Sequence, residues 1–288
     1  MEDNIRISKE NAKAFYERSC KDPELTKVLL QQSVDAGEYE AALVFAENLA
    51  KLMPDSYVPV HAKFAVLVKK NDLGEAGLCL AGVQNRFGDD PDYINDRLAY
   101  TIEVMGTAAA KKYLEKIADK PAYESREFLE LCARIYNAEG GERKYIQCLY
   151  ILHKQFASEK ARFLLALKSA EHQQYEAALK WYAAVINGYS GSAEYFMSLA
   201  GRSSMLQMLG RDNWREEMVK AANETDLAST VHVTNLWLRS ISAGLWEILE
   251  EDENATFNHS LIAELEKYAA DPEKYLRSTQ KNQKRENP

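Results

Sequence analysis

The sulfur and imidazole side chains are the first candidates for chemistry in this chain of 288 residues. Catalytic and metal-binding cysteines and histidines gather at short, fixed spacings. Here the cysteines form no C-x-x-C pair and the histidines are scattered. Cys148 and His153 are five residues apart, a poor spacing for one helix face, so we favour ordinary packing over a metal site. In apolar helical contexts cysteines pack as small hydrophobic side chains, so we expect reduced, buried thiols at Cys20, Cys79, Cys132 and Cys148.

Nucleotide-binding and zinc-enzyme signatures are absent from the sequence. There is no G-x-x-x-x-G-K-[ST], no G-x-G-x-x-G and no H-E-x-x-H. Gly74, Gly77 and Gly82 have the wrong spacing and lie within a helical pattern. Acidic pairs such as Glu38 with Glu40 lie near expected turns, where carboxylates complement the helix dipole. We therefore predict no catalytic residues, no cofactor, no metal and no enzymatic activity.

The charge balance limits the class of partner. The chain has 36 basic and 44 acidic residues and a net charge of -8, which argues against nucleic acid or an anionic membrane surface as the main partner. No apolar run reaches the length of a membrane span. The acidic N-terminus is not followed by an apolar segment, so we expect no signal peptide and a cytoplasmic location. The three Asn-x-Ser/Thr matches, at Asn223, Asn254 and Asn258, are then interpreted as chance.

Two nearly identical stretches point to the elements that position the side chains. EYEAAL begins at Glu38 and QYEAAL begins at Gln174, and their tyrosines are 136 residues apart, four times 34. A fixed period of that length is typical of stacked helical hairpins. Residues taken at steps of 34 form columns of like character. In the second helix, the small-residue column is Ala42, Ala76, Ala110, Lys144 (the exception) and Ala178, and two apolar columns are Ala46, Leu80, Leu114, Cys148 and Tyr182, and Leu49, Val83, Ile117, Ile151 and Val185. In the first helix, one apolar column is Leu30, Phe64, Leu98, Cys132 and Ala166.

Helix start and stop signals divide the chain into about six such repeats. In the first, Asp22 and Pro23 start a helix that runs to Asp35, Gly37 permits a turn, and a second helix spans Tyr39 to Leu52. The following repeats are expected at 57–90, 91–124, 125–158, 159–192 and 193–229, with candidate caps or breaks at Ser56, Asp90, Ser125 and Ser158 and turn glycines at Gly106, Gly140, Gly141 and Gly210.

The ends of the chain depart from this period. A helix at about 9–19 is expected to cover the first repeat. Beyond residue 229 we predict helices at about 231–250 and 257–268, with the acidic run 250–253 ending the first of them and Gly244 as a candidate turn. The boundaries are therefore 1–22 for an N-terminal cap, 23–229 for the array, 230–277 for C-terminal capping helices and 278–288 for a disordered tail.

The hairpin resembles the tetratricopeptide repeat (TPR), a family of 34-residue helix–turn–helix units. The family's places for glycine, tyrosine, alanine, a large apolar residue, a small residue and a closing proline hold Gly37, Tyr39, Ala42, Ala46, Leu49 and Pro54, so the expected aromatic is missing at Ala46. Thr26 departs from the pattern, since the family has an aromatic residue there. The resemblance covers residues 23–229 and implies an all-α fold, a right-handed superhelical α-solenoid of stacked antiparallel helix pairs with helical caps at both ends.

In that family the first helices line a concave groove that holds a partner. When the family's groove positions are carried over by their place in the 34-residue repeat, the groove would be polar at its N-terminal end and apolar toward the fourth and fifth repeats. The predicted partner-binding residues are Lys27, Gln31, His61, Asn95, Leu129, Ala133, Tyr136, Phe163 and Leu167. The alternative interpretation is that this apolar stripe is core. The family's clamp for acidic chaperone tails does not carry over, because Asp92 and Asp96 stand where basic side chains would be needed.

We therefore predict a scaffold or adaptor that binds a helix or an extended apolar segment of another protein, centred on Leu129, Tyr136, Phe163 and Leu167. The alternative is a helical-array enzyme or regulatory subunit with a pocket near Trp237 and Trp246. Self-association through an open end of the array is a third hypothesis. The aromatic side chains are expected to pack between helices rather than form a ligand cage.

Overall fold

A computed structural model describes residues 12, 14, 15, 17, 22–117, 125–188, 190–231 and 235–270. Within these residues every regular element is an α-helix, as the sequence predicted. The chain divides into two compact units, unit 1 (Met1–Cys148) and unit 2 (Leu149–Pro288), whose boundary lies inside one helix. Each unit is described by itself.

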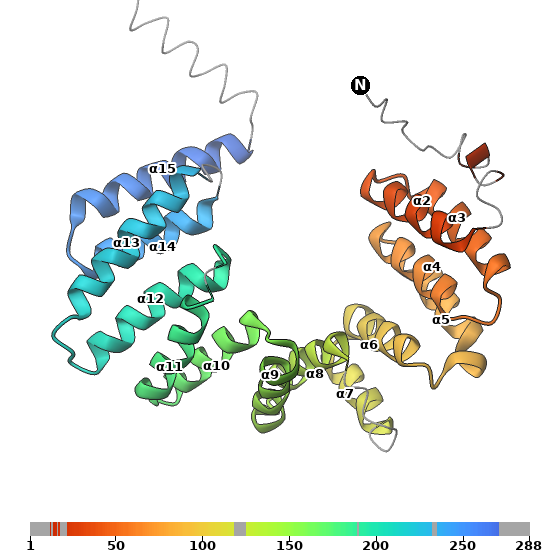
Figure 1. The fold of residues 1–288 in the computed structure, drawn as a ribbon, viewed down its shortest axis with the longest axis horizontal. Coiled ribbons are helices and arrows are strands. Elements are labelled where there is room, and N and C mark those ends of the chain that lie inside the picture. The colour runs from red at the N-terminus through yellow and green to blue at the C-terminus, as the bar shows by residue number, and fades with distance from the viewer. Residues whose placement is uncertain are drawn as a thin grey trace, which may run out of the picture. The chain divides into compact units, whose positions relative to one another are not determined.

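Within each unit the helices follow one another as antiparallel pairs, and neighbours along the chain are neighbours in space (Figure 1). We call the first helix of each pair helix A and the second helix B. The pairs are α2 (Pro23–Asp35) and α3 (Tyr39–Leu52), α4 (Val58–Lys69) and α5 (Leu73–Phe87), α6 (Pro91–Met105) and α7 (Thr107–Lys116), α8 (Arg126–Ala138) and α9 (Glu142–Phe156), α10 (Glu159–Glu171) and α11 (Tyr175–Ile186), α12 (Ala193–Met208) and α13 (Trp214–Val231), and α14 (Leu236–Ile248) and α15 (Asp252–Ala270).

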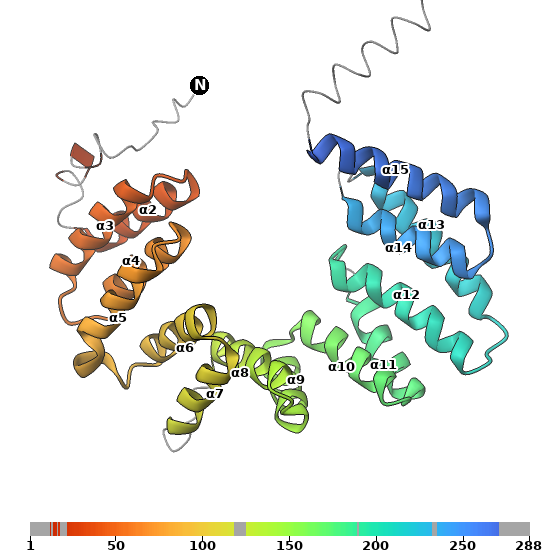
Figure 2. The ribbon, with the colours of Figure 1, turned by 180° about the vertical axis from the view of Figure 1, so that it is seen from behind.

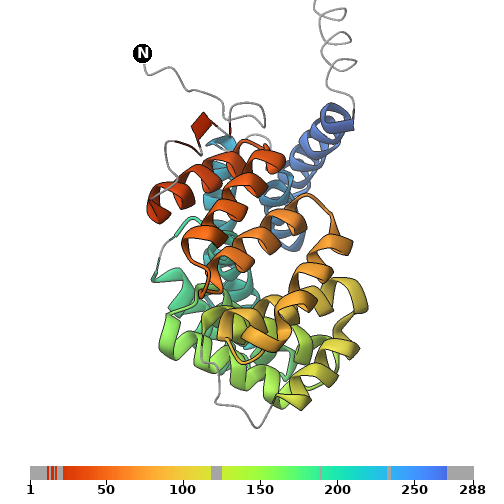
Figure 3. The same ribbon diagram turned by 90° about the vertical axis from the view of Figure 1, so that its right-hand side faces the viewer.

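The first hairpin has the bounds predicted from its sequence. Asp22 caps α2 by accepting hydrogen bonds from the backbone N–H groups of Glu24 and Leu25, at 2.9 and 3.2 Å. Gly37 then adopts a φ of 74°, which is open to glycine at little cost and turns the chain into α3. In Figure 3 the red and orange helices of unit 1 face the viewer, and the helices from α2 to α5 lie side by side.

Polar caps set the period of the array. The N-cap residues of successive A helices follow one another at intervals of 33 to 35 residues as far as α12: Asp22, Tyr57, Asp90, Ser125, Ser158 and Ser192. All except Tyr57 accept a hydrogen bond from the first turn of their helix, which replaces a partner that the helix itself cannot supply. The interval to the next N-cap, Asn235, is 43 residues, so the period lengthens there.

The columns predicted at steps of 34 lie in the core. The four alanines of the small-residue column are fully buried, whereas Lys144, its exception, is exposed. The apolar columns that begin at Ala46 and Leu30 are buried throughout. The apolar column that begins at Leu49 is buried or half-buried. Small residues are required where two helices approach closely, and the buried alanines mark that contact at the same position of each repeat. The stacked-hairpin prediction is confirmed.

The C-terminal helices differ from the prediction in their bounds. The helix expected at about 231–250 is present as α14, which begins at Leu236, since Val231 still belongs to α13; Gly244, the candidate turn, lies inside α14. The acidic run follows the end of α14, as predicted, but the next helix begins within this run and not at 257: Asp252 and Glu253 are in the first turn of α15, where the helix dipole favours carboxylates. In Figure 2, α12 to α15 of unit 2 are seen from behind as two successive hairpins.

Two helical glycines permit close contacts between hairpins. A Cβ atom on Gly201 of α12 would lie 2.5 Å from Cζ of Tyr182, whose ring is 2% exposed. A Cβ atom on Gly77 of α5 would lie 2.3 Å from the hydroxyl oxygen of Tyr100, which is half-buried. Each glycine therefore leaves room for a tyrosine from a neighbouring helix.

The described cysteines are free thiols, of which Cys132 and Cys148 are buried and Cys79 is half-buried. Burial raises the pKa of Cys132 to about 12 and that of Cys148 to about 11, so both remain protonated. Cys20, most of the expected helix at 9–19 and the tail 278–288 lie outside the described residues. In the part of the chain that is described, no helix combines the length and the apolar character needed to cross a bilayer.

Candidate functional site

Several A helices contact the A helix of the next hairpin directly. In unit 1, α4 contacts α6 and α6 contacts α8, in addition to the contacts of α4 with α5 and of α6 with α7. In unit 2, α10 contacts α12 and α12 contacts α14. Side chains at equivalent places on these helices therefore share one face, which is where the sequence places the partner groove.

The structure divides the predicted groove residues of unit 1 into accessible and buried groups. His61 on α4 and Gln31 on α2 are exposed, and Lys27, Asn95 and Tyr136 are half-buried. Leu129 and Ala133 on α8 are 7% and 6% exposed and pack as core. The accessible part of this face in unit 1 is therefore polar and aromatic rather than aliphatic. We call the half-buried and exposed residues on the three contacting helices, His61, Asn95 and Tyr136, the A-helix face of unit 1.

A buried carboxylate connects α4 to α6 on this face. Asp96 accepts a hydrogen bond of 2.7 Å from the hydroxyl of Tyr57, and its Oδ2 lies 2.9 Å from Nδ1 of His61. The Asp96 side chain is 9% exposed, whereas the His61 side chain is 54% exposed. The imidazole thus turns one nitrogen toward the carboxylate, and its other edge is accessible to a ligand.

The electrostatics of this group favour a charged imidazole and a neutral phenol. The hydrogen bond from His61 to Asp96 raises the pKa of the histidine, although partial burial opposes the shift. Burial, followed by the negative charge of Asp96, raises the pKa of Tyr57. Burial also raises the pKa of the nearby Cys79 thiol, so this thiol is not an activated nucleophile. The arrangement can donate hydrogen bonds to a ligand, and it lacks a nucleophile among the described residues.

Asn95 adds a second polar group on α6. Its Nδ2 donates to Oγ of Ser125 at 3.2 Å, and the same hydroxyl oxygen accepts from the backbone N–H of Phe128 at the start of α8. The Oδ1 atom of Asn95 is buried and has no hydrogen-bond partner within the described residues. Asn95 therefore links α6 to α8 and leaves one acceptor unmatched.

The polar residues of α2 are engaged within their own helix. Nζ of Lys27 lies 2.7 Å from Oε1 of Glu24, and Nε2 of Gln31 lies 2.7 Å from Oδ1 of Asp35. Tyr136 on α8 has Nζ of Lys144 at 5.1 Å from its ring centre, a cation–π distance. These contacts leave His61 and Asn95 as the polar groups of the face with unused hydrogen-bonding capacity.

In unit 2 the predicted groove residues belong largely to the core. Phe163 is 7% exposed, and its ring centre is 6.3 Å from that of Tyr182 in a cluster that includes Ala166 and Ala178. Leu167 is half-buried against the same cluster. Phe163 and Leu129, two of the four residues on which the sequence centred the groove, are therefore packing residues here.

The C-terminal region, where the alternative hypothesis places a pocket, has a bonded and packed interior. Trp246 is 6% exposed and its Nε1 donates to Asp226 at 2.9 Å. Asn258, which is 1% exposed, donates to Asp226 at 3.2 Å and accepts from Arg239 at 3.3 Å. Since Trp246 and Asn258 are occupied by these contacts, they are not available to a ligand. Trp237 is partly buried against the neighbouring core cluster.

Sequence reasoning missed the roles of Tyr57 and Asp96. A usable signal exists, because His61 and Asp96 are 35 residues apart, about one repeat. Polar residues one period apart on successive A helices are close in space, so such pairs are candidates for contact. Among the described residues, no group of three or more His, Cys, Asp or Glu side chains could hold a metal ion.

Comparison with known proteins shows the fold. The sequence matches no protein-family model and no curated protein. A tetratricopeptide repeat protein from Parabacteroides merdae has a similar structure, with a TM-score of 0.54 and 15% identity over 89% of this chain and 93% of that chain. Yeast Tom70 has a TM-score of 0.53 and 14% identity over 96% of this chain. The APC/C hetero-tetramer Cut9–Hcn1 contains a chain with a TM-score of 0.57 and 12% identity over 93% of this chain.

The matched regions make up 58% of the Tom70 chain and 51% of the chain in the Cut9–Hcn1 structure. At identities this low the similarity concerns the fold alone. The chain has the TPR-like fold that its sequence resembled, an architecture typical of protein-interaction scaffolds.

Proposed function

We propose that this protein is a non-enzymatic scaffold that binds an extended segment of another protein along the A-helix face of unit 1. The observation that carries this proposal is the position of His61 and Asn95. They occupy equivalent places on contacting helices and remain accessible or half-buried, whereas the repeat columns beside them are buried. The fold of the similar structures supports the scaffold class, and one of those structures is a hetero-tetramer of two named components.

The chemistry of the face suits a peptide backbone. When protonated, His61 donates a hydrogen bond from its free nitrogen, and the unmatched Oδ1 of Asn95 accepts one when a bound peptide turns this buried atom outward. An extended peptide presents a carbonyl acceptor and an N–H donor at every residue, so it can serve both groups. Neighbouring packed helices are about 8–10 Å apart, which an extended chain spans in about three residues. Tyr136 lies on the next helix A and offers an aromatic contact surface.

A matched pair of double variants tests the proposal. The full-length chain and the variant His61→Ala with Asn95→Ala would be compared by quantitative mass spectrometry of the proteins that each retains from native lysate. The control variant, Glu47→Ala with Lys112→Ala, changes exposed residues on helices B of the same unit. We expect at least one protein retained by the wild type and by the control to be lost, about tenfold or more, from the A-helix variant, which is the effect of losing roughly 1.4 kcal/mol of binding energy.

Circular dichroism of all three proteins checks that the fold is intact, since both changes lie outside the buried columns. Equal retention of every bound protein by the two double variants contradicts the proposed binding face.

A further inference from the structure

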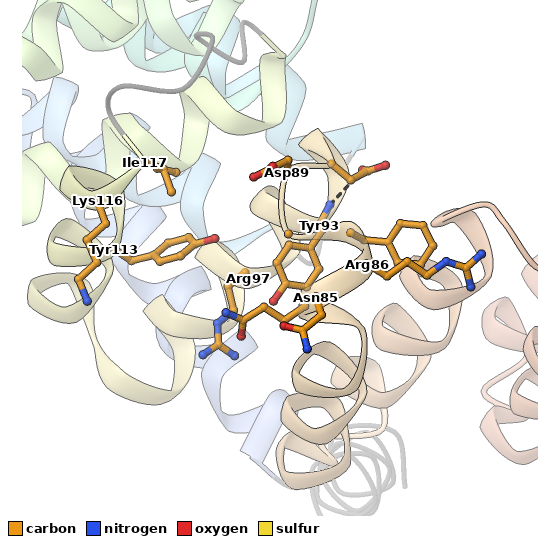
Figure 4. A pocket seen from close by; sticks show the side chains of 12 residues that line it. Asn85, Arg86, Asp89, Tyr93, Arg97, Tyr113, Lys116 and Ile117 are labelled. Atoms are coloured by element: carbon orange, nitrogen blue, oxygen red, sulfur yellow. Dashed lines mark hydrogen bonds between the residues drawn. The ribbon is translucent and has the colours of Figure 1, made fainter.

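A second candidate site lies within unit 1, at a place that the A-helix face does not include. A cavity of about 660 Å³ opens between the end of α5, the first half of α6 and the end of α7. Arg86 and Phe87 line it from α5, Tyr93 and Arg97 from α6, and Tyr113 and Lys116 from α7 (Figure 4). A space of that size accommodates a small organic molecule.

The cavity wall has positive charge that the protein does not neutralise by pairing. Arg86 forms an ion pair with Asp55 at 2.5 Å, and the side chain of Asp90 accepts backbone hydrogen bonds as the N-cap of α6. Among the described residues, neither Arg97 nor Lys116 forms an ion pair with a carboxylate. The lining holds three cations, Arg86, Arg97 and Lys116, and two carboxylates, Asp89 and Asp90, so its net charge is +1 in a chain whose net charge is -8.

A buried hydroxyl at the same cavity also lacks a partner. Tyr93 is 2% exposed, and its hydroxyl has no hydrogen-bond partner among the described residues. Burial raises the pKa of this phenol and the charge of Arg97 opposes the shift, so the hydroxyl remains a neutral donor close to a cation. Buried polar groups are nearly always bonded, and one that is not points to an acceptor supplied from outside the protein.

The third wall is aromatic. In Figure 4 the ring of Tyr113 extends from α7 toward α6, and the guanidinium of Arg97 turns toward the same space. Phe87 also lines the cavity, and its ring centre lies 5.5 Å from that of Tyr57. Cations and a hydroxyl donor thus lie beside aromatic rings, an arrangement that suits a ligand with an anionic end and a planar body.

We propose that this cavity binds a small phosphate monoester with a planar organic group. Arg97 and Lys116 hold the phosphate, the hydroxyl of Tyr93 donates to one of its oxygens, and Tyr113 and Phe87 contact the organic part. A phosphate monoester is close to dianionic at neutral pH and has three acceptor oxygens, which matches two cations and one hydroxyl better than a single carboxylate does.

Calorimetric titration of the full-length protein with adenosine 5′-monophosphate, adenosine and inorganic phosphate tests this assignment. We expect the nucleotide to bind with a dissociation constant of about 1 mM or tighter, and both fragments to bind at least about tenfold more weakly. Absence of nucleotide binding, or equal binding of either fragment, would overturn the proposal.

Variants separate the site from unspecific charge attraction. Arg97→Gln and Lys116→Gln should each weaken nucleotide binding about tenfold, whereas Arg134→Gln and Lys69→Gln, at exposed positions of the same unit, should not. Tyr93→Phe should weaken binding severalfold and leave the melting temperature of the free protein unchanged, because the hydroxyl has no partner inside the protein. Equal affinity of Arg97→Gln and wild type for the nucleotide would refute the site.

Discussion

Unit 1 and unit 2 each bond a carboxylate to polar side chains, two in unit 1 and three in unit 2, and these partners differ in their access to solvent. In unit 1, Asp96 is bonded to Tyr57 and His61, and the imidazole is half exposed. In unit 2, Asp226 accepts from Ser242, Trp246 and Asn258, and these three donors are each at most 6% exposed.

The comparison shows how one hairpin architecture uses buried polarity in two ways. A carboxylate that is bonded to an exposed imidazole can respond to pH and to a ligand, because one member of the pair remains in contact with solvent. We call Asp226 and its three buried donors in unit 2 the sealed group. Such a group can only favour the arrangement of helices in which its hydrogen bonds are made. Unit 2 has the longer interval between N-caps and departs from the 34-residue period, and the sealed group joins α13, α14 and α15 there.

The largest expected effect comes from breaking the sealed group. Asn258→Leu removes the side chain that bonds both Arg239 and Asp226, and it leaves the buried Arg239 and the half-buried Asp226 each short of a partner. We expect a loss of about 3–5 kcal/mol in the free energy of unfolding, measured by urea denaturation followed by circular dichroism. Asn254→Leu, at an exposed position of the same helix, should change stability little. A loss below about 1 kcal/mol for Asn258→Leu would mean that the group does not select the helix arrangement.

Removal of one donor from the open group should have a smaller effect. Tyr57→Phe deletes the 2.7 Å hydrogen bond to Asp96, and a hydrogen bond to a charged group contributes about 1.5–3 kcal/mol. Tyr93 is a matched control, because its ring lies 5.8 Å from that of Tyr57 and its hydroxyl has no partner among the described residues. Urea denaturation should show a loss for Tyr57→Phe and none for Tyr93→Phe. Equal losses would contradict the bond to Asp96.

Gly201 in unit 2 and Gly77 in unit 1, each packed against a tyrosine, allow the packing of the two units to be compared. Gly201→Ala in unit 2 forces a methyl group against the enclosed ring of Tyr182, and overpacking of this kind costs about 1–3 kcal/mol. Gly77→Ala in unit 1 meets the hydroxyl oxygen and the ring carbon Cζ of Tyr100, which is half-buried and has more room to shift than Tyr182, and alanine favours a helix over glycine by up to about 1 kcal/mol. The melting temperature of Gly201→Ala should therefore be well below that of wild type, and the melting temperature of Gly77→Ala should be close to it. The reverse order would show that Tyr182 yields more easily than Tyr100.

The smallest effect is a dependence on pH confined to unit 1. The pKa of His61 is raised in the folded protein above its ordinary value of 6.5. The contribution of the pair to stability is therefore complete below pH 6.5 and is lost as the pH rises through the higher folded value. Because His61 is largely exposed, we expect less than about 1 kcal/mol. NMR titration should show the raised pKa in wild type, and His61→Gln should remove this part of the pH dependence of unfolding. An unshifted titration would contradict the bond to Asp96.

Much of the fold could be predicted from sequence because its signals are local. Asp22, Pro23 and Gly37 define the first hairpin, and the alanines at steps of 34 identify the helix contacts, since a cap, a turn and an apolar period each depend on residues a few positions apart. The sequence signals place the start of the last helix too late, at about 257. The run 250–253 follows the end of α14, but its second half already has the charges that start a helix.

The site could be predicted only in part. The phase of the repeat placed His61 and Asn95 on the A helices and kept them out of the buried columns. It could not tell whether Phe163 faces a partner or the core, because a small rotation of a helix about its axis moves one side chain from the surface into the interior.

The sequence by itself determined the period, the caps and the class of fold, because these depend on which residues recur at a helical or repeat spacing. Only the tertiary structure decided that Asp96 joins Tyr57 to His61, that Phe163 packs against Tyr182, and that Asn258 joins Arg239 to Asp226. Each of these contacts joins residues that are 19 or more positions apart, and it forms only when neighbouring helices have settled at a particular rotation and distance.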